Sequence, residues 1–197
     1  KKGQTDLYLY TFKTKELKQL TNSIYSEIHP DWSPDGKQIV FATDELKFKQ
    51  KPVNGYWNYN LAVLDLVTNE IQQRELFPDA NNLNPQYSKN GNILFLSDRD
   101  GSNNIYEFVA DSAKINQLTN SRTGVSSLTP FGPAMSLSGS RDRLVYSYYS
   151  ENSFQIYQLS LDKAIRTEVD SLNIDHRDAM LPFENSRMPE MVNKQLK

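Results

Sequence analysis

The sequence contains no cysteine among its 197 residues. This absence excludes disulfide bonds, thiolate nucleophiles and cysteine-ligated metal sites. Only two histidines occur, His29 and His176, and neither belongs to a His-Glu-x-x-His motif. The sequence also lacks a Gly-x-Ser-x-Gly motif and a glycine-rich phosphate loop. We therefore expect a chain that is not an enzyme, with no catalytic residue, no metal ligand and no bound cofactor.

Charge of one sign and long hydrophobic runs are also scarce. The formal net charge is −2 and the basic residues are scattered, which argues against a nucleic-acid partner. No apolar run approaches the roughly 18 residues of a membrane-spanning helix. Hydrophobic residues make up 38% of the chain and aromatic residues 11%, which is enough to build a folded core.

What the sequence does contain is an internal repeat. The pentapeptide QLTNS occurs at residues 19–23 and again at 117–121, 98 positions apart. Proline-centred segments occur at 29–36 (HPDWSPDG), 84–91 (NPQYSKNG) and 132–139 (GPAMSLSG). The repeat length is thus about 49 residues, which is in the range of β-propeller blades.

Each proline-centred segment precedes two short apolar runs. The first runs are residues 39–42, 93–96 and 144–147, and the second are 61–66, 105–109 and 156–161; residues 7–10 form another such run. They have the length and the β-branched and aromatic content of strands. We assign four antiparallel strands per repeat: A is the proline segment, B and C are the two apolar runs, and D ends in Gln-Leu-Thr. This pattern predicts an all-β protein, a β-propeller of four-stranded blades.

The segments HPDWSPDGKQIVF at 29–41, SDRDGSNNIY at 97–106 and QLTN at 19–22 and 117–120 resemble the TolB-type (WD40-like) β-propeller repeat. The resemblance covers residues 6 to about 165. In the third repeat, residues 132–136 lack the strand A aromatic residue, and Leu-Ser-Gly-Ser at 137–140 replaces Ser-Pro-Asp-Gly. The resemblance implies a bacterial periplasmic or outer-membrane-associated protein whose protein partners are outer-membrane or peptidoglycan-associated. The repeat also resembles, more loosely, propellers of prolyl-oligopeptidase-like hydrolases.

The repeats divide the chain into five parts. We expect the C-terminal half of a blade at residues 1–22, blades at 23–77, 78–119 and 120–168, and a linker or tail at 169–197, in which residues 188–196 could form a short helix. These are about three and a half blades, whereas closed propellers usually have four to eight. We expect the remaining blades to come from the same polypeptide or from another chain.

In an antiparallel blade, the B–C and D–A connections emerge on one face, which we call the loop face. The B–C connection at 45–60, ELKFKQKPVNGYWNYN, is unusually long, and the D–A connection at 120–131 lies on the same face. Aromatic and basic residues in long loops are typical of partner-binding surfaces. The candidate binding residues are Phe48, Tyr56, Trp57, Tyr59, Lys47 and Lys49, together with His29 at the head of a strand A. The alternatives are a hairpin extension packed on its own blade and a turn-capping role for His29.

Asp98-Arg99-Asp100-Gly101 could suggest a calcium loop, but Val109 stands where the bidentate glutamate would be required. A hairpin turn is the better interpretation. We expect a non-catalytic propeller module that binds protein through its loop face in an envelope assembly. The alternatives are an accessory or substrate-gating propeller of a larger hydrolase, or a glycan-binding propeller that uses Trp57 and Tyr59.

Overall fold

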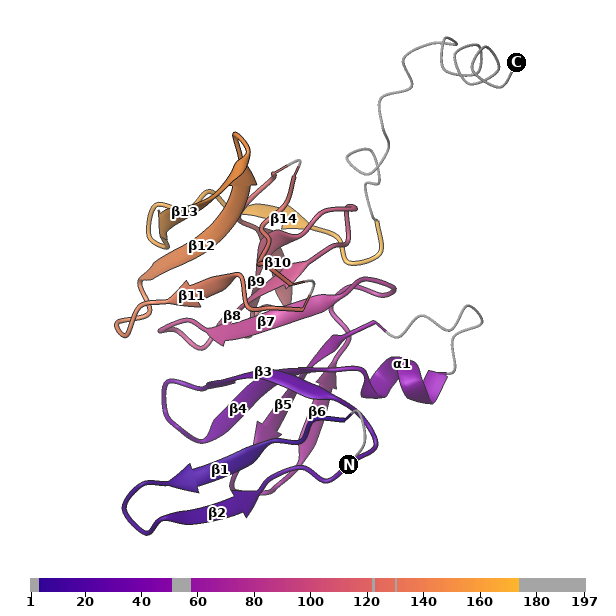
Figure 1. The fold of residues 1–197 in the computed structure, drawn as a ribbon. Helices are drawn as coiled ribbons and strands as arrows, with labels where there is room; N and C mark the ends of the chain where they lie inside the picture. Colours follow the sequence, from indigo (N-terminus) through magenta and orange to yellow (C-terminus); the bar gives the residue numbers. More distant parts are fainter. Residues whose placement is uncertain (1–3, 51–57, 122, 130, 174–197) are drawn as a thin grey trace, which may run out of the picture.

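A computed structural model describes residues 4–50, 58–121, 123–129 and 131–173. Figure 1 shows β-sheets stacked one after another along the chain, which confirms the prediction of an all-β propeller fold. The sheets are arranged as an open series of blades. Tyr56, Trp57, His176 and the possible helix at 188–196 lie outside the described residues.

Four sheets account for the strands of the described residues. An N-terminal half blade contains β1 (Tyr8–Thr11) and β2 (Glu16–Gln19). The first full blade contains β3 (Glu27–Trp32), β4 (Gln38–Thr43), β5 (Asn60–Asp65) and β6 (Ile71–Arg74). The middle blade contains β7 (Asn82–Tyr87), β8 (Ile93–Ser97), β9 (Asn104–Val109) and β10 (Lys114–Gln117). The third blade contains β11 (Met135–Leu137), β12 (Arg143–Ser150) and β13 (Ser153–Ser160).

The last strand, β14 (Thr167–Val169), does not join the third blade. It pairs antiparallel with β10, so that the middle blade gains a fifth strand. The ammonium of Lys114 contacts the Glu168 carboxylate at 2.7 Å across this pair. Because β14 covers the outer edge of β10, that edge is no longer free to pair with another chain.

The turn between strands A and B is closed by equivalent hydrogen bonds in all three blades, although the turn of the middle blade is one residue shorter. The N–H of the first serine of the turn donates to a carbonyl across the turn. These bonds join Ser33 to Gln38, Ser88 to Asn92 and Ser138 to Arg143. The residue three positions later has a positive φ, and it is Gly36, Gly91 or Arg141. The third repeat therefore aligns through Ser138 and not, as the sequence suggested, through Ser136. Arg141 occupies a left-handed position that glycine fills in the other two blades.

Side chains of strand A in the first full blade and in the middle blade accept hydrogen bonds from the backbone of the next blade. His29 Nδ1 accepts from the N–H of Asn84 at 3.2 Å, and Asn84 Oδ1 accepts from that of Ala134 at 2.9 Å. Two residues further on, Asp31 accepts from the N–H of Tyr87 at 2.8 Å, and Gln86 accepts from that of Leu137 at 2.7 Å. We call these four contacts the inter-blade bonds. They satisfy backbone donors of the next blade, and one of these, Asn84, lies at the β-bulge of β7.

Arg141 joins all three blades at the A–B end. Its guanidinium contacts the Asp31 carboxylate at 2.8 Å and donates to the carbonyls of Tyr87 at 2.6 Å and Trp32 at 3.1 Å. A left-handed backbone costs a non-glycine residue about 1–2 kcal/mol. Four hydrogen bonds to two other blades offset this strain at Arg141.

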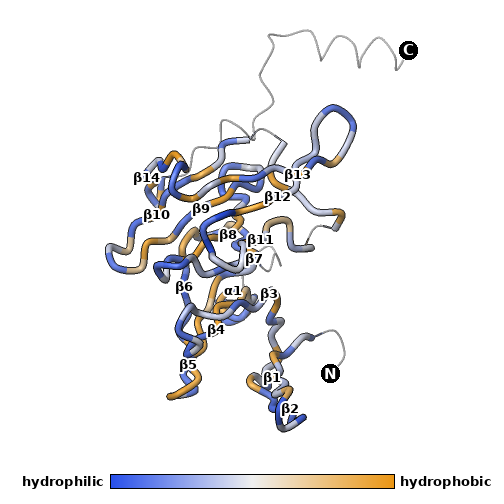
Figure 2. The backbone as a smooth tube through the Cα atoms, turned by 90° about the vertical axis from the view of Figure 1, so that its left-hand side faces the viewer, coloured by the Kyte–Doolittle hydropathy of each residue, from blue (hydrophilic) through white to orange (hydrophobic). Residues whose placement is uncertain are grey.

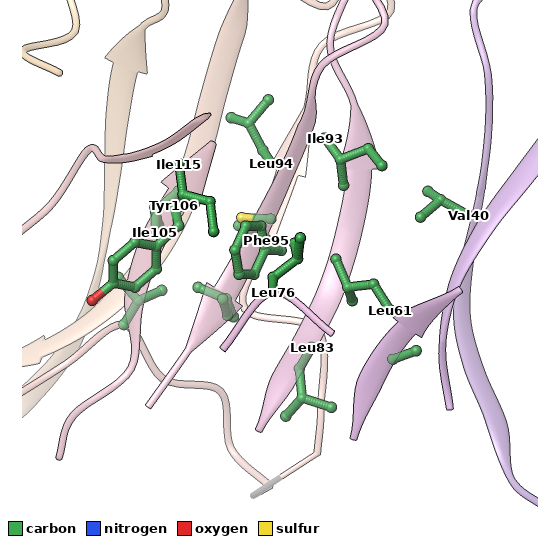
Figure 3. Packing of buried hydrophobic residues seen from close by; sticks show 14 of the residues in the cluster. Val40, Leu61, Leu76, Leu83, Ile93, Leu94, Phe95, Ile105, Tyr106 and Ile115 are labelled. Atoms are coloured by element: carbon green, nitrogen blue, oxygen red, sulfur yellow. The ribbon is translucent and has the colours of Figure 1, made fainter. Parts of the chain in front are cut away.

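The hydrophobic core runs between the blades, and Figure 3 shows its side chains projecting from neighbouring sheets. Alternate residues of β4, β5, β8 and β9 point to one sheet face or the other, and neighbouring blades cover both faces. At its centre, the rings of Phe77, Phe95 and Tyr106 are fully buried and lie 5.0 to 5.8 Å apart. A smaller cluster packs Leu7 of the N-terminal half blade against the first full blade.

Candidate partner-binding surface

The long B–C connection begins with a helix, α1 (Glu45–Gln50), where the sequence predicted a loop or a hairpin extension. Figure 1 places α1 at the end of the blades opposite the β3–β4, β7–β8 and β11–β12 turns. This is the loop face. The helix therefore presents its side chains where the D–A connections also emerge.

Four aromatic side chains from three loop-face segments form two ring pairs. Tyr25 and Phe48 meet edge to face with ring centroids 5.4 Å apart, and Tyr59 and Phe131 lie 5.5 Å apart. The side chain of Ser26, the neighbour of Tyr25, is close enough to the Tyr59 hydroxyl to act on its pKa, so the two pairs lie near each other. Burial raises the pKa of this Tyr59 hydroxyl, so the ring stays neutral over the physiological range. We call Tyr25, Phe48, Tyr59 and Phe131 the aromatic row.

Ion pairs hold α1 in place behind this row. The buried ammonium of Lys47 lies 2.9 Å from Asp79 and 3.5 Å from Glu75 in the next D–A connection. Glu45 accepts from Gln73 of β6 at 2.7 Å and pairs with Lys49, which also lies over the ring of Tyr25. Lys47 is therefore a fixed structural cation, whereas Lys49 remains on the surface. The helix is positioned before any partner arrives, which reduces the entropy cost of binding.

The surface around the row is apolar and exposed. Phe131 is 53% exposed and Leu128, in the same connection, 87%, while Ile24 and Phe48 are also exposed. Exposed apolar side chains gathered on one face are typical of protein-interaction sites.

A groove of about 890 Å³ begins beside Tyr59, Phe131 and His29. It continues along β3 to Trp32 and is bounded on its other side by residues of β1. The groove thus extends from the loop face toward the A–B end, between the N-terminal half blade and the first full blade.

The structure brings His29 and Tyr59 to this groove, and it places Lys47, Phe48 and Lys49 on α1. The sequence did not single out Tyr25 or Phe131 as binding residues, although the connection ending at Phe131 was expected on this face. Their positions depend on how three loops pack, which no local pattern shows. Phe131 was recognisable only as an exposed aromatic residue in a D–A connection.

His29 is a structural acceptor in this site. Its imidazole Nδ1 accepts the N–H of Asn84, and its burial lowers the pKa of the ring, an effect only partly opposed by a hydrogen bond with the backbone of Phe131. Protonation would replace the acceptor lone pair with a second N–H donor. His29 therefore contributes to blade packing in its neutral form.

This role predicts a pH dependence of stability. Because the folded pKa is lowered, the contribution of neutral His29 is fully present above its unfolded value of 6.5 and is lost as pH falls through the folded value. We expect His29→Asn to weaken the fall in the free energy of unfolding between pH 7.5 and 5.5, because asparagine fills the equivalent position as Asn84 and does not titrate. Urea unfolding at both pH values measures this difference. An equal fall in both proteins would show that His29 is not the titrating group.

The Asp98–Gly101 turn binds neighbouring protein groups. Asp98 accepts from the backbone and side chain of Asn81, and Asp100 accepts from the Tyr106 hydroxyl at 2.7 Å. Arg99 lies 4.3 Å from the centroid of the Phe77 ring and donates to the carbonyl of Asn173. In the described part of the chain, His, Asp and Glu residues form no group of three or more that could hold a metal ion.

No protein-family model matches the sequence, and no curated protein matches it. Solved structures do match. TolB from Acinetobacter baumannii is 20% identical with a TM-score of 0.61 over 83% of this chain, and a putative TolB from Agrobacterium tumefaciens is 19% identical with a TM-score of 0.58 over 85%. A puromycin hydrolase is 14% identical with a TM-score of 0.54 over 81%.

These likenesses support a TolB-type β-propeller fold, as the sequence repeats predicted. The chain spans 37% and 57% of the two TolB structures and 24% of the hydrolase. Within the described residues, no helix has the length and apolar character needed to cross a membrane.

Proposed function

We propose that this chain is a non-catalytic propeller module that binds a protein partner through the aromatic row on its loop face. The observation that carries the proposal is that row, which brings residues from three separate connections together and exposes Phe48 and Phe131. Aromatic side chains supply large contact areas at a low conformational cost, and they dominate protein-interface energetics.

The blades act as a rigid support in this proposal. The inter-blade bonds and the Arg141 contacts fix neighbouring blades, and the Lys47 pairs fix α1 on the first full blade. A partner therefore meets a surface that needs little rearrangement. Exposed Lys49 at its rim favours an acidic group at the matching position of the partner.

We place this module in a bacterial envelope assembly, in the periplasm or at the outer membrane. The support is the structural likeness to TolB proteins, combined with a surface suited to protein contacts. Outer-membrane or peptidoglycan-associated proteins are the partners that we propose. Tyr56 and Trp57 remain candidate contributors to the same surface.

A second candidate function is an accessory or substrate-gating propeller of a larger hydrolase. The likeness to a puromycin hydrolase favours it. A serine hydrolase domain in the same polypeptide would support this role, and an envelope-anchoring domain would support the first.

The test of the proposed function is photo-crosslinking combined with truncation of the aromatic row. A photoreactive phenylalanine analogue at Phe131 is exposed to a detergent-solubilised envelope extract of the producing bacterium, and the captured protein is identified and purified. We expect Phe48→Ala with Phe131→Ala to weaken its binding at least tenfold, since each interface aromatic contributes about 1–2 kcal/mol. Phe12→Ala is the matched control, because Phe12 is 87% exposed but lies at the β1–β2 turn. Equal affinities for the double variant and the control would overturn the proposal.

A further inference from the structure

The β1–β2 hairpin is the structural equivalent of β9–β10, with every residue shifted by 98. The N–H of Leu7 donates to Thr21 Oγ1 at 2.8 Å, and that of Ile105 to Thr119 Oγ1 at 2.9 Å. The N–H of Leu20 donates to the carbonyl of Leu7, and that of Leu118 to Ile105, both at 2.8 Å. The N–H of Ser23 donates to Asp6 Oδ1, and that of Ser121 to Asn104 Oδ1. Three matching contacts identify β1 as a strand C and β2 as a strand D.

The two hairpins differ sharply in burial. Tyr106 in β9 is completely buried, whereas the equivalent Tyr8 in β1 is 53% exposed. Strand β9 pairs with β8 on one edge and β10 on the other, but β1 pairs only with β2 among the described strands. Figure 2 shows the β1–β2 hairpin as a projection at the N-terminal end of the molecule.

Among the described residues, no strand pairs with the outer edge of β1, which we call its free edge. Leu7 directs both its N–H and its carbonyl toward β2. Successive residues of a strand direct these two groups to opposite edges. Tyr8 and Tyr10 therefore direct theirs to the opposite edge. That edge bounds the groove of about 890 Å³.

The facing wall of the groove carries two further backbone donors. In the middle blade, the N–H groups of Asn84 and Tyr87 donate to His29 and Asp31 of the preceding blade. The equivalent positions in β3 are His29 and Trp32, and both residues line the groove. A complementary occupant would therefore place acceptor side chains two residues apart against this wall, as His29 and Asp31 do against β7.

We propose that the groove is the docking site for a β-hairpin of the same repeat type, supplied from outside residues 1–197. The outer strand of this hairpin pairs with the free edge of β1 and is apolar, like Ile-Leu-Phe-Leu-Ser at 93–97. Its inner strand lies along β3 and carries a His/Asn-Pro-Asp/Gln sequence, whose first and third side chains accept the N–H groups of His29 and Trp32. With this occupant, β1 and β2 become the outer half of a complete four-stranded blade.

The test uses the chain's own hairpin as a synthetic probe. A peptide of residues 82–98 contains strands A and B of the middle blade, including the acceptors Asn84 and Gln86. It is added to the isotope-labelled 197-residue chain, and amide hydrogen exchange is followed by NMR. We expect saturable binding that slows exchange at Tyr8 and Tyr10 at least tenfold, with a blue shift in the emission of Trp32, which lines the groove.

Matched controls separate this site from others. A peptide with Asn84→Ala and Gln86→Ala keeps its apolar strand, and we expect it to bind at least tenfold more weakly. In the chain, we expect Tyr8→Asp to weaken peptide binding and Phe48→Ala to leave it unchanged. The comparison separates failure of the groove proposal from failure of the proposed loop-face function. Three results would overturn the proposal. They are no binding of the peptide, equal binding of the two peptides, and slowed amide exchange at β13 instead of β1. Before any peptide is added, the chain could self-associate and already protect the amides of Tyr8 and Tyr10. This result would also overturn the proposal, because a second copy of the chain would then occupy the groove.

Discussion

Phe77→Ala is expected to lower the free energy of unfolding by about 3–5 kcal/mol, the usual cost of deleting a fully buried phenylalanine ring. Phe77 lies in the D–A connection between β6 and β7, yet it is completely buried against Phe95 and Tyr106. Removing the ring leaves a cavity between the two neighbouring rings. It also removes the aromatic face 4.3 Å from the buried guanidinium of Arg99.

Chemical denaturation of Phe77→Ala and Phe77→Leu separates the two contributions. Leucine restores much of the volume but no aromatic face, and we expect it to cost about 1–2 kcal/mol. Phe12→Ala, at an exposed position, serves as the control with a change below about 0.5 kcal/mol. A loss below 1 kcal/mol for Phe77→Ala would show that this connection does not belong to the core.

The second large effect is expected for Asp31→Ala, with a loss of about 2–4 kcal/mol. The substitution leaves the N–H of Tyr87 without its acceptor and removes the carboxylate that faces Arg141. An unpaired buried donor costs about 1–3 kcal/mol, and breaking a partly buried ion pair adds to this. The side chains of Asp31 and Arg141 are each 23% exposed, so solvent screens part of their interaction.

A double-mutant cycle with Arg141 isolates the pair. Arg141→Gly removes the guanidinium but suits the φ of 55°, so we expect it to be about 1 kcal/mol more stable than Arg141→Ala. The Asp31 and Arg141 substitutions should not be additive, because each removes the same contact. Asp111→Ala, at an exposed turn, is the control for loss of a carboxylate. Additive losses would show that the contact does not couple the blades.

Most of the fold could be predicted because its signals are local. The apolar runs at 39–42 and 93–96 became β4 and β8, and Ser-Pro-Asp-Gly became the expected tight turn. The third repeat was misaligned by two residues because Gly139 resembles the turn glycines in the sequence. The left-handed residue is Arg141, whose strain is offset by contacts to other blades that no local pattern reveals.

Contacts between segments that lie far apart in the sequence were harder to predict. Nothing in Thr-Glu-Val at 167–169 indicates that β14 returns to the middle blade, since any short β-prone segment could cover that edge. The candidate surface was predicted in part. Composition and topology identified Phe48 and Tyr59, but the burial of Lys47 depends on carboxylates about 30 residues away in the sequence.

The central claim is that the inter-blade bonds hold the blades in register. The loop face is one rigid surface because of these bonds. Native-state hydrogen exchange at the amides of Asn84, Tyr87 and Leu137 tests it most directly, since each donates to the preceding blade. We expect these amides to exchange only through global unfolding, with exchange free energies within about 1 kcal/mol of those of Leu94 and Phe95 in β8. Rapid exchange at the three amides while β8 stays protected would contradict the claim, because the blades would then move independently.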